Sequence, residues 1–133
     1  MMKRVVWIAS TLDDLRQFPR PVQKRIGDAL FAAQVGEKHD HARPLKGFGG
    51  ATVLEIVERY DTDAYRAVYT VALLEGVYVL HAFQKKSKEG RATPQRDIDV
   101  IQQRLQVARE TDLQLRRLRE EQESREQGKR EDQ

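Results

Sequence analysis

The sequence predicts an α+β fold in which a strand, two helices and three antiparallel strands build a small, mostly antiparallel sheet, followed by a C-terminal helix. Two segments, 65–74 and 77–83, are rich in β-branched, aromatic and apolar residues, and the Glu75-Gly76 pair between them suits a two-residue hairpin turn because glycine tolerates positive φ. Apolar residues at the 3–4 spacing of a helix recur in 20–35 and 94–109. We expect the earlier helical segment to cover one face of the sheet.

The first part of the chain supplies a strand and a pair of helices. Residues 3–9 are predicted as a strand, and because the run VVWI within it is apolar on both faces, we expect it inside the sheet rather than at an edge. Helices are predicted at 11–17 and 20–35, the second with a proline in its first turn and Gly36 as its C-cap. The next expected elements, in chain order, are a polar loop, a strand and a turn, at 37–50, 52–60 and 61–64.

The length of 133 residues predicts one domain, at 1–109, followed by a charged tail at 110–133. The tail holds eight acids and six bases, so it contributes −2 to the net charge of +3 and residues 1–109 carry +5. From Arg119 onward the tail has no apolar side chain, and we expect it to be partly helical and then disordered. A basic globular part favours attraction to nucleic acid or to an acidic protein.

Composition also excludes several kinds of chemistry. Cysteine is absent, which excludes disulfides and thiolate catalysis, and with three scattered histidines we expect no metal site and no cofactor. His39 and His41 are two residues apart, but solvated loop histidines are the preferred interpretation over a metal site. No apolar run approaches twenty residues and no signal peptide is present, so we expect a cytoplasmic protein that does not contact a membrane.

Strand register places several cations on one face of the predicted sheet. If 75–76 is a two-residue loop and 61–64 a four-residue loop, Arg59, Arg66 and Lys85 form one row across three strands. Like charges directly opposite one another destabilise a sheet, so this row favours a site where an anion neutralises them. The alternative is a solvated strand end at which each cation pairs with an acid, Glu58, Asp61 or Glu89.

His81 shares that face, but it lies four residues along from Lys85, about 13 Å by strand rise. That separation is too large for the two side chains to hold one phosphate. We therefore expect a structural or gating role with Glu55 as the partner of His81, while a catalytic role stays open. The opposite face suits the helix pair and carries Leu54, Ile56, Ala67, Tyr69, Val71, Leu80 and Ala82.

Three motifs carry a resemblance to a known superfamily: LEIVER at 54–59, AYRAVYTV at 64–71 and VLHAFQKKSKEGRATP at 79–94. With the predicted order of elements, they resemble the RelE/ParE superfamily of type II toxin–antitoxin toxins, and most closely its HigB-like, phage-related branch. The likeness covers residues 3–109 and leaves the charged tail outside.

The resemblance implies a RelE-like fold and a ribosome-dependent mRNA endoribonuclease, in which a ribose 2′-hydroxyl attacks the adjacent phosphate. The catalytic candidates that it implies are Arg66, Lys85, Lys86 and His81, and the candidates for binding RNA phosphate are Arg59, Lys88 and Arg91. Its implied partners are a cognate helix-turn-helix antitoxin, the ribosome and mRNA.

The sequence also departs from the family pattern. Several RelE-type toxins use a tyrosine after the last strand, and other HigB-like members have a C-terminal end rich in His and Asp, but neither feature occurs here. The general acid and base are therefore open among Lys85, Lys86, Lys88 and His81. The ParE branch keeps the fold and inhibits gyrase without cleaving RNA, which leaves a gyrase-binding module or an inert phage regulator as alternatives.

Overall fold

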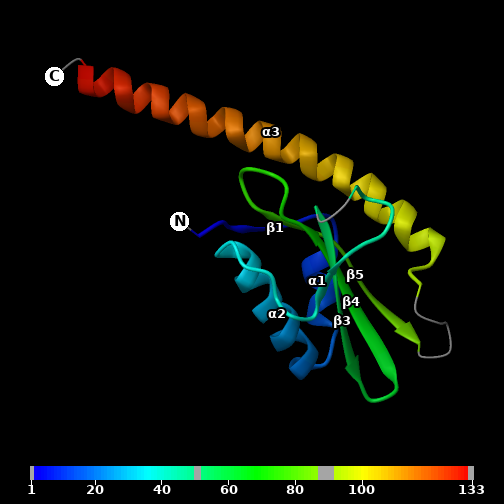
Figure 1. The fold of residues 1–133 in the computed structure, drawn as a ribbon. Helices are drawn as coiled ribbons and strands as arrows, with labels where there is room; N and C mark the ends of the chain where they lie inside the picture. The colour runs from blue at the N-terminus through cyan, green and yellow to red at the C-terminus, as the bar shows by residue number, and fades with distance from the viewer. Residues whose placement is uncertain (1, 50–51, 87–91, 132–133) are drawn as a thin grey trace.

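The computed structural model describes residues 2–49, 52–86 and 92–131 and shows an α+β arrangement, as predicted (Figure 1). Its elements, in chain order, are β1 (Val5–Trp7), α1 (Thr11–Arg16), α2 (Arg20–Gln34), β2 (Ala42–Pro44), β3 (Val53–Tyr60), β4 (Asp63–Thr70), β5 (Val77–Lys86) and α3 (Gln95–Glu131). They form one five-stranded sheet with the strand order β1-β5-β4-β3-β2, in which β1 runs parallel to β5 and all other neighbours are antiparallel.

The prediction that the first strand lies inside the sheet was wrong, because β1 is an edge strand. Its apolar residues are explained by the helices that cover both faces of the sheet. Val5 and Trp7 pack with the core beneath α1 and α2, whereas Val6 and Ile8 pack with the core beneath α3. A strand can therefore be apolar on both sides and still have only one neighbouring strand.

Two hydrophobic cores, one on each face of the sheet, hold the helices in place. The first joins the stripe of α1 and α2 to β3, β4 and β5, through Leu15, Phe18, Val22, Ile26, Leu54, Ile56, Tyr69 and Val79 among others. The second joins α3 to the opposite face, through Val68, Tyr78, Leu80, Ile101, Leu105 and Ala108 among others. The site described below lies along β3, beyond the part of that strand that β2 covers.

The strand β2 was not predicted, because it lies within the segment expected to be a polar loop. It pairs Ala42 with Ile56 and Pro44 with Leu54, but only Ala42 of its three residues is buried. A strand this short with one buried side chain has no alternating pattern that a sequence could reveal.

The predicted register across β3, β4 and β5 was also wrong, by two residues between β3 and β4 and, as far as Val68, by two residues between β4 and β5. The turn after β3 contains only Asp61 and Thr62, since Tyr60 pairs with Asp63, and Asp61 adopts a left-handed backbone with φ 56°. At the other end, β4 stops at Thr70 and six residues precede Val77, so the expected two-residue turn is a longer loop. A shift of two residues preserves the face to which each side chain points.

A register irregularity after Val68 inverts the faces of the residues of β5 that precede His81. Val68 pairs with His81 whereas Tyr69 pairs with Val79, so Leu80 is the extra residue of β5. Leu80 packs with the α3 core, and not with the helix pair as predicted.

Gly76 has a different role from the one predicted. Its φ is not positive; instead, a Cβ at this position would lie 3.0 Å from the carbonyl oxygen of Arg4 and 3.0 Å from Cγ2 of Val6. The neighbouring Val77 donates its backbone N–H to that same carbonyl oxygen at 2.9 Å. The glycine thus lets the chain pass close to β1 where the parallel pairing begins.

The last helix, α3, does not end near Arg109 with its apolar stripe but continues to Glu131 (Figure 1). Asp112, beyond the stripe, is buried and accepts hydrogen bonds from the backbone N–H groups of Leu74 and Glu75 and from the hydroxyl of Tyr78. Farther along, Arg119 contacts Glu75 and also Glu123 four residues ahead. Polar contacts of this kind support a helix where burial does not.

No helix in the three described ranges is long and apolar enough to cross a membrane.

Candidate functional site

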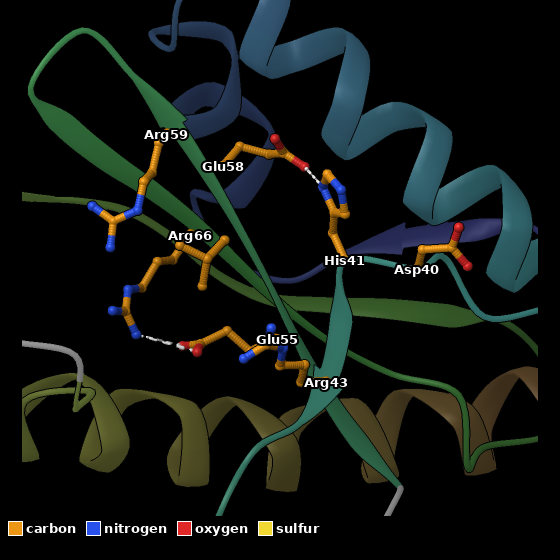
Figure 2. A pocket seen from close by; sticks show the side chains of 8 residues that line it. Asp40, His41, Arg43, Glu55, Glu58, Arg59 and Arg66 are labelled. Atoms are coloured by element: carbon orange, nitrogen blue, oxygen red, sulfur yellow. Dashed lines mark hydrogen bonds and ion pairs between the residues drawn. The ribbon is translucent and has the colours of Figure 1, made fainter.

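A cavity of about 640 Å³ lies along β3 beyond the point where β2 ends. The strand β2 pairs only with Leu54–Ile56, so within the described residues it leaves the following part of β3 uncovered. Figure 2 shows the side chains that line the cavity, which come from the loop before β2 and from β2, β3 and β4. They are Asp40, His41, Arg43, Glu55, Val57, Glu58, Arg59 and Arg66.

Arg66 is the buried cation of this site. It lies on β4 opposite Val57 and Phe83, and its residue is 5 % exposed. Its Nη1 donates to both carboxylate oxygens of Glu55, at 3.2 and 3.3 Å, and to Oγ1 of Thr93 at 3.3 Å. Thr93 in turn donates to Glu55 at 3.0 Å, so three side chains fix one another (Figure 2 shows the Arg66–Glu55 part).

Two other arginines of the cavity are exposed. Arg59, at the end of β3, lies opposite Ala64, and Arg43 on β2 lies opposite Glu55. Neither makes an ion pair or a side-chain hydrogen bond within the part of the chain that the structure describes. These are the two cations that an incoming anion meets without first displacing a protein partner.

A second pair of side chains, His41 and Glu58, lines the same cavity. Nδ1 of His41 lies 2.7 Å from Oε1 of Glu58, and Nη1 of Arg25 on α2 lies 3.6 Å from the other carboxylate oxygen. The Glu58 side chain is 4 % exposed, whereas the His41 side chain is 59 % exposed. The buried carboxylate therefore holds a histidine that faces solvent.

The predicted row of Arg59, Arg66 and Lys85 is not formed as expected. All three share one face, but Arg59 and Lys85 each lie opposite Ala64, and Arg66 lies two residues farther along β4. No two of these cations are therefore directly opposite each other. The acid that pairs with Arg66 is Glu55, which was not among those predicted to neutralise the row.

Lys85 is buried, and its ammonium group donates a hydrogen bond to the backbone carbonyl of Ala92. It does not appear among the described residues that line the cavity. Lys86 ends β5 opposite Asp63. Lys88 and Arg91 lie outside the described residues.

His81 is held by α3 and not by Glu55, which corrects the predicted partner. Its Nε2 donates to Oδ1 of Asp97 at 2.8 Å, and its Nδ1 accepts from Nη1 of Arg104 at 3.3 Å. Its ring also stacks on Phe83 with the ring centroids 4.5 Å apart. Because both nitrogens are engaged, this geometry fits the structural alternative.

Sequence reasoning found part of this site and missed the rest. Arg59 and Arg66 were predicted site residues and both line the cavity. Arg43 was missed because β2 was missed, and His41 was interpreted as a solvated loop histidine in preference to a metal ligand. No group of three or more potential metal-binding side chains is present in the described parts of the chain. Glu58 was named only as an acid that could pair with a cation of the row, and its position on the face of β3 that otherwise carries Leu54 and Ile56 is the signal that was not used.

Comparisons with known proteins identify the family. Residues 13–106 match the family described as Phage derived protein Gp49-like (DUF891). Neither the curated proteins nor the solved structures that were searched include a match. The matched range begins within α1, ends in the first third of α3 and contains every described residue that lines the cavity. The chain therefore belongs to the Gp49-like phage-derived family, a RelE-like family associated with toxin–antitoxin systems.

Proposed function

We propose that this protein is the toxin of a toxin–antitoxin module, of the HigB-like branch, and that it cleaves mRNA on the ribosome. The observation that carries the proposal is the pair of exposed arginines, Arg43 and Arg59, beside a cavity whose third arginine, Arg66, is fixed by Glu55. An RNA backbone supplies the anion that such cations bind. Family membership supports a toxin-like role.

In the proposed reaction a ribose 2′-oxygen forms a bond to the adjacent phosphorus while the bond from phosphorus to the 5′-oxygen breaks. The 2′-hydroxyl gives up its proton, the leaving 5′-oxygen gains one, and a 2′,3′-cyclic phosphate remains. Negative charge accumulates on the phosphate oxygens during this step. Cations that bind the phosphate oxygens at that stage stabilise the transition state more than the ground state, and Arg59 and Arg43 are the residues assigned to that role.

The proposed partners follow from this activity. The ribosome presents the message, and a cognate helix-turn-helix antitoxin restrains the nuclease during growth in the cytoplasm. The net charge of +5 on residues 1–109 favours rapid association with a polyanion such as mRNA or with an acidic antitoxin.

Expression in bacterial cells tests the proposal. The wild-type protein should arrest growth and create new RNA ends within translated messages, and an Arg43→Gln/Arg59→Gln variant should leave those messages intact. The control is Arg16→Gln, which removes an exposed arginine of α1 on the opposite face of the sheet. Growth arrest without new RNA ends would contradict the proposal.

One observation favours a second candidate, a ParE-like gyrase inhibitor that works by binding alone. Arg66, Lys85 and His81 are all bound to other parts of the same chain, and Arg66 and Lys85 are almost fully buried. In the same cells, a DNA-damage response with intact messages would support this candidate. An inert phage regulator would produce neither effect.

A further inference from the structure

The His41–Glu58 pair has the geometry of a proton-transfer dyad. A carboxylate can only accept a hydrogen bond, so Nδ1 of His41 carries the hydrogen that is donated to Oε1 of Glu58 at 2.7 Å. That tautomer leaves a lone pair on Nε2. Nε2 has no hydrogen-bond partner among the described residues, and His41 lines the cavity (Figure 2). A buried acid on the α2 side of β3 thus holds an exposed base that lines the same cavity as the arginines.

The burial of Glu58 argues that this pair is more than a surface contact. Removing a carboxylate from water is costly unless strong partners compensate for the lost hydration. Here the partners are a histidine that is 59 % exposed and an arginine, Arg25, that is 51 % exposed and 3.6 Å away. A purely structural role would be served as well by an apolar side chain at this position of β3. The carboxylate gives His41 a defined ring orientation and tautomer, which an apolar side chain does not.

We infer that His41 is the general base of the proposed RNA cleavage and that Glu58 is its positioning residue. This inference rests on the proposed function and adds the residue that moves the proton. Nε2 of His41 accepts the proton of the ribose 2′-hydroxyl as the 2′-oxygen bonds to phosphorus. The bond to the 5′-oxygen breaks, and that oxygen takes a proton from water. Arg43 and Arg59 stabilise the charge on the phosphate in the same cavity.

The protonation of His41 depends on every charged group around it, and these come from several elements. Glu58 faces it from β3, Arg25 reaches the same carboxylate from α2, and the ring of His39 meets the His41 ring edge-on at a centroid distance of 5.1 Å. The other charged groups of the cavity are Asp40, Arg43, Glu55, Arg59 and Arg66.

The test is a single-turnover cleavage assay on ribosomes that carry a message, with the full-length protein. His41→Asn is the informative variant, because the Asn amide can still donate to Glu58 but the acceptor Nε2 is lost. His39→Asn is the matched control: Nδ1 of His39 accepts a hydrogen bond from the backbone N–H of His41, which an Asn oxygen can also accept, and His39 does not line the cavity. His41→Asn should cut at least about a hundredfold more slowly than wild type, and His39→Asn within about threefold of it.

Two further readouts separate proton transfer from structural support. The wild-type rate should rise with pH as the base loses its proton, and this rise should disappear in His41→Asn. A His41→Gly variant should regain activity when imidazole is added, because the free base can occupy the vacated position. Glu58→Gln should keep the ring in place but alter the pH profile.

The outcomes are distinguishable from a failure of the proposed function. If the wild type cuts the message but His41→Asn cuts it within threefold of wild type, the assignment of His41 is overturned and the nuclease proposal stands. A large loss in His41→Asn that keeps the wild-type dependence on pH, or that imidazole does not restore in His41→Gly, also overturns the assignment. A wild-type protein that leaves messages intact on the ribosome overturns both.

Discussion

At the scale of single residues, Arg66 shows why a residue can be predicted correctly and its surroundings incorrectly. Its place on the α3-facing side of the sheet followed from alternation along β4. Its partners did not, because the predicted register put Arg59 opposite Arg66, whereas Val57 lies there and Glu55 is two residues along β3 from it. Thr93 reaches the guanidinium from a distant segment. The guanidinium is therefore part of a buried hydrogen-bond network that holds Glu55, one of the side chains that line the cavity.

This network predicts a cost in stability when Arg66 is removed. Arg66→Met should lower the free energy of unfolding by about 3 kcal/mol, because Glu55 would stay largely buried without its cation. Adding Glu55→Gln should restore part of that loss, since the remaining amide can bond Thr93 without an uncompensated charge. Urea unfolding of the two single variants and the double variant measures this coupling. Strictly additive losses would show that the two side chains do not stabilise each other.

At the scale of elements, the strand pairings show what the sequence can and cannot reveal. Alternation predicted the faces of the side chains of β3 and β4 correctly, because the register error between these strands is two residues. It failed in β5 before His81, where Leu80 is an extra residue. The pairing itself depended on whether the segment 61–64 closes as a two-residue or a four-residue turn, and its composition suits both. The short strand β2, which positions Arg43, has no alternation of apolar and polar residues that would reveal it in the sequence. The cavity could therefore not be predicted, although two of its arginines were.

The contact between α3 and the loop before β5 predicts a second effect on stability. Asp112→Ala should destabilise the protein by about 2 to 4 kcal/mol, because the N–H groups of Leu74 and Glu75 and the buried hydroxyl of Tyr78 would lose their acceptor. Gln114→Ala, an exposed change on the same helix, is the control and should have little effect. Thermal unfolding monitored by circular dichroism measures both. Equal melting temperatures would mean that α3 docks without this carboxylate.

Tyr69 in β4 predicts a loss of stability at alkaline pH. Burial raises the pKa of its hydroxyl from the ordinary 10.0 to about 12. Between these values the unfolded chain releases a proton that the folded chain keeps, so the stability present below pH 10 falls as pH rises toward 12. This residue alone should account for about 1 kcal/mol of loss between pH 9 and pH 11.

Tyr69→Phe tests that assignment. The hydroxyl has no hydrogen-bond partner among the described residues, so the variant should be as stable as wild type or more stable at neutral pH. Its urea midpoint should fall less steeply between pH 9 and pH 11. The same fall in both proteins would assign the alkaline loss to other groups, such as Tyr65 and Tyr78, whose pKa values burial also raises.

At the scale of the whole molecule, the extent of the folded body can be tested by truncation. A chain ending at Arg119 keeps Asp112 and the contact from Arg119 to Glu75, and the residues removed carry no apolar side chain. Its melting temperature should stay within a few degrees of the full chain. A chain ending at Arg109, the predicted domain boundary, lacks Asp112 and should melt well below both. Equal melting of the two truncated chains would place the boundary at 109 after all.

The most direct test of the central claim is the chemical identity of the RNA ends that the protein produces on the ribosome. With purified wild-type protein and a ribosome-bound message, we expect a new end that carries a 2′,3′-cyclic phosphate. Arg59→Gln should form that end about tenfold or more slowly, because one cation that stabilises the transition state is lost, while Arg16→Gln should match wild type. An intact message, or an Arg59→Gln variant that cuts as fast as Arg16→Gln, would contradict the account.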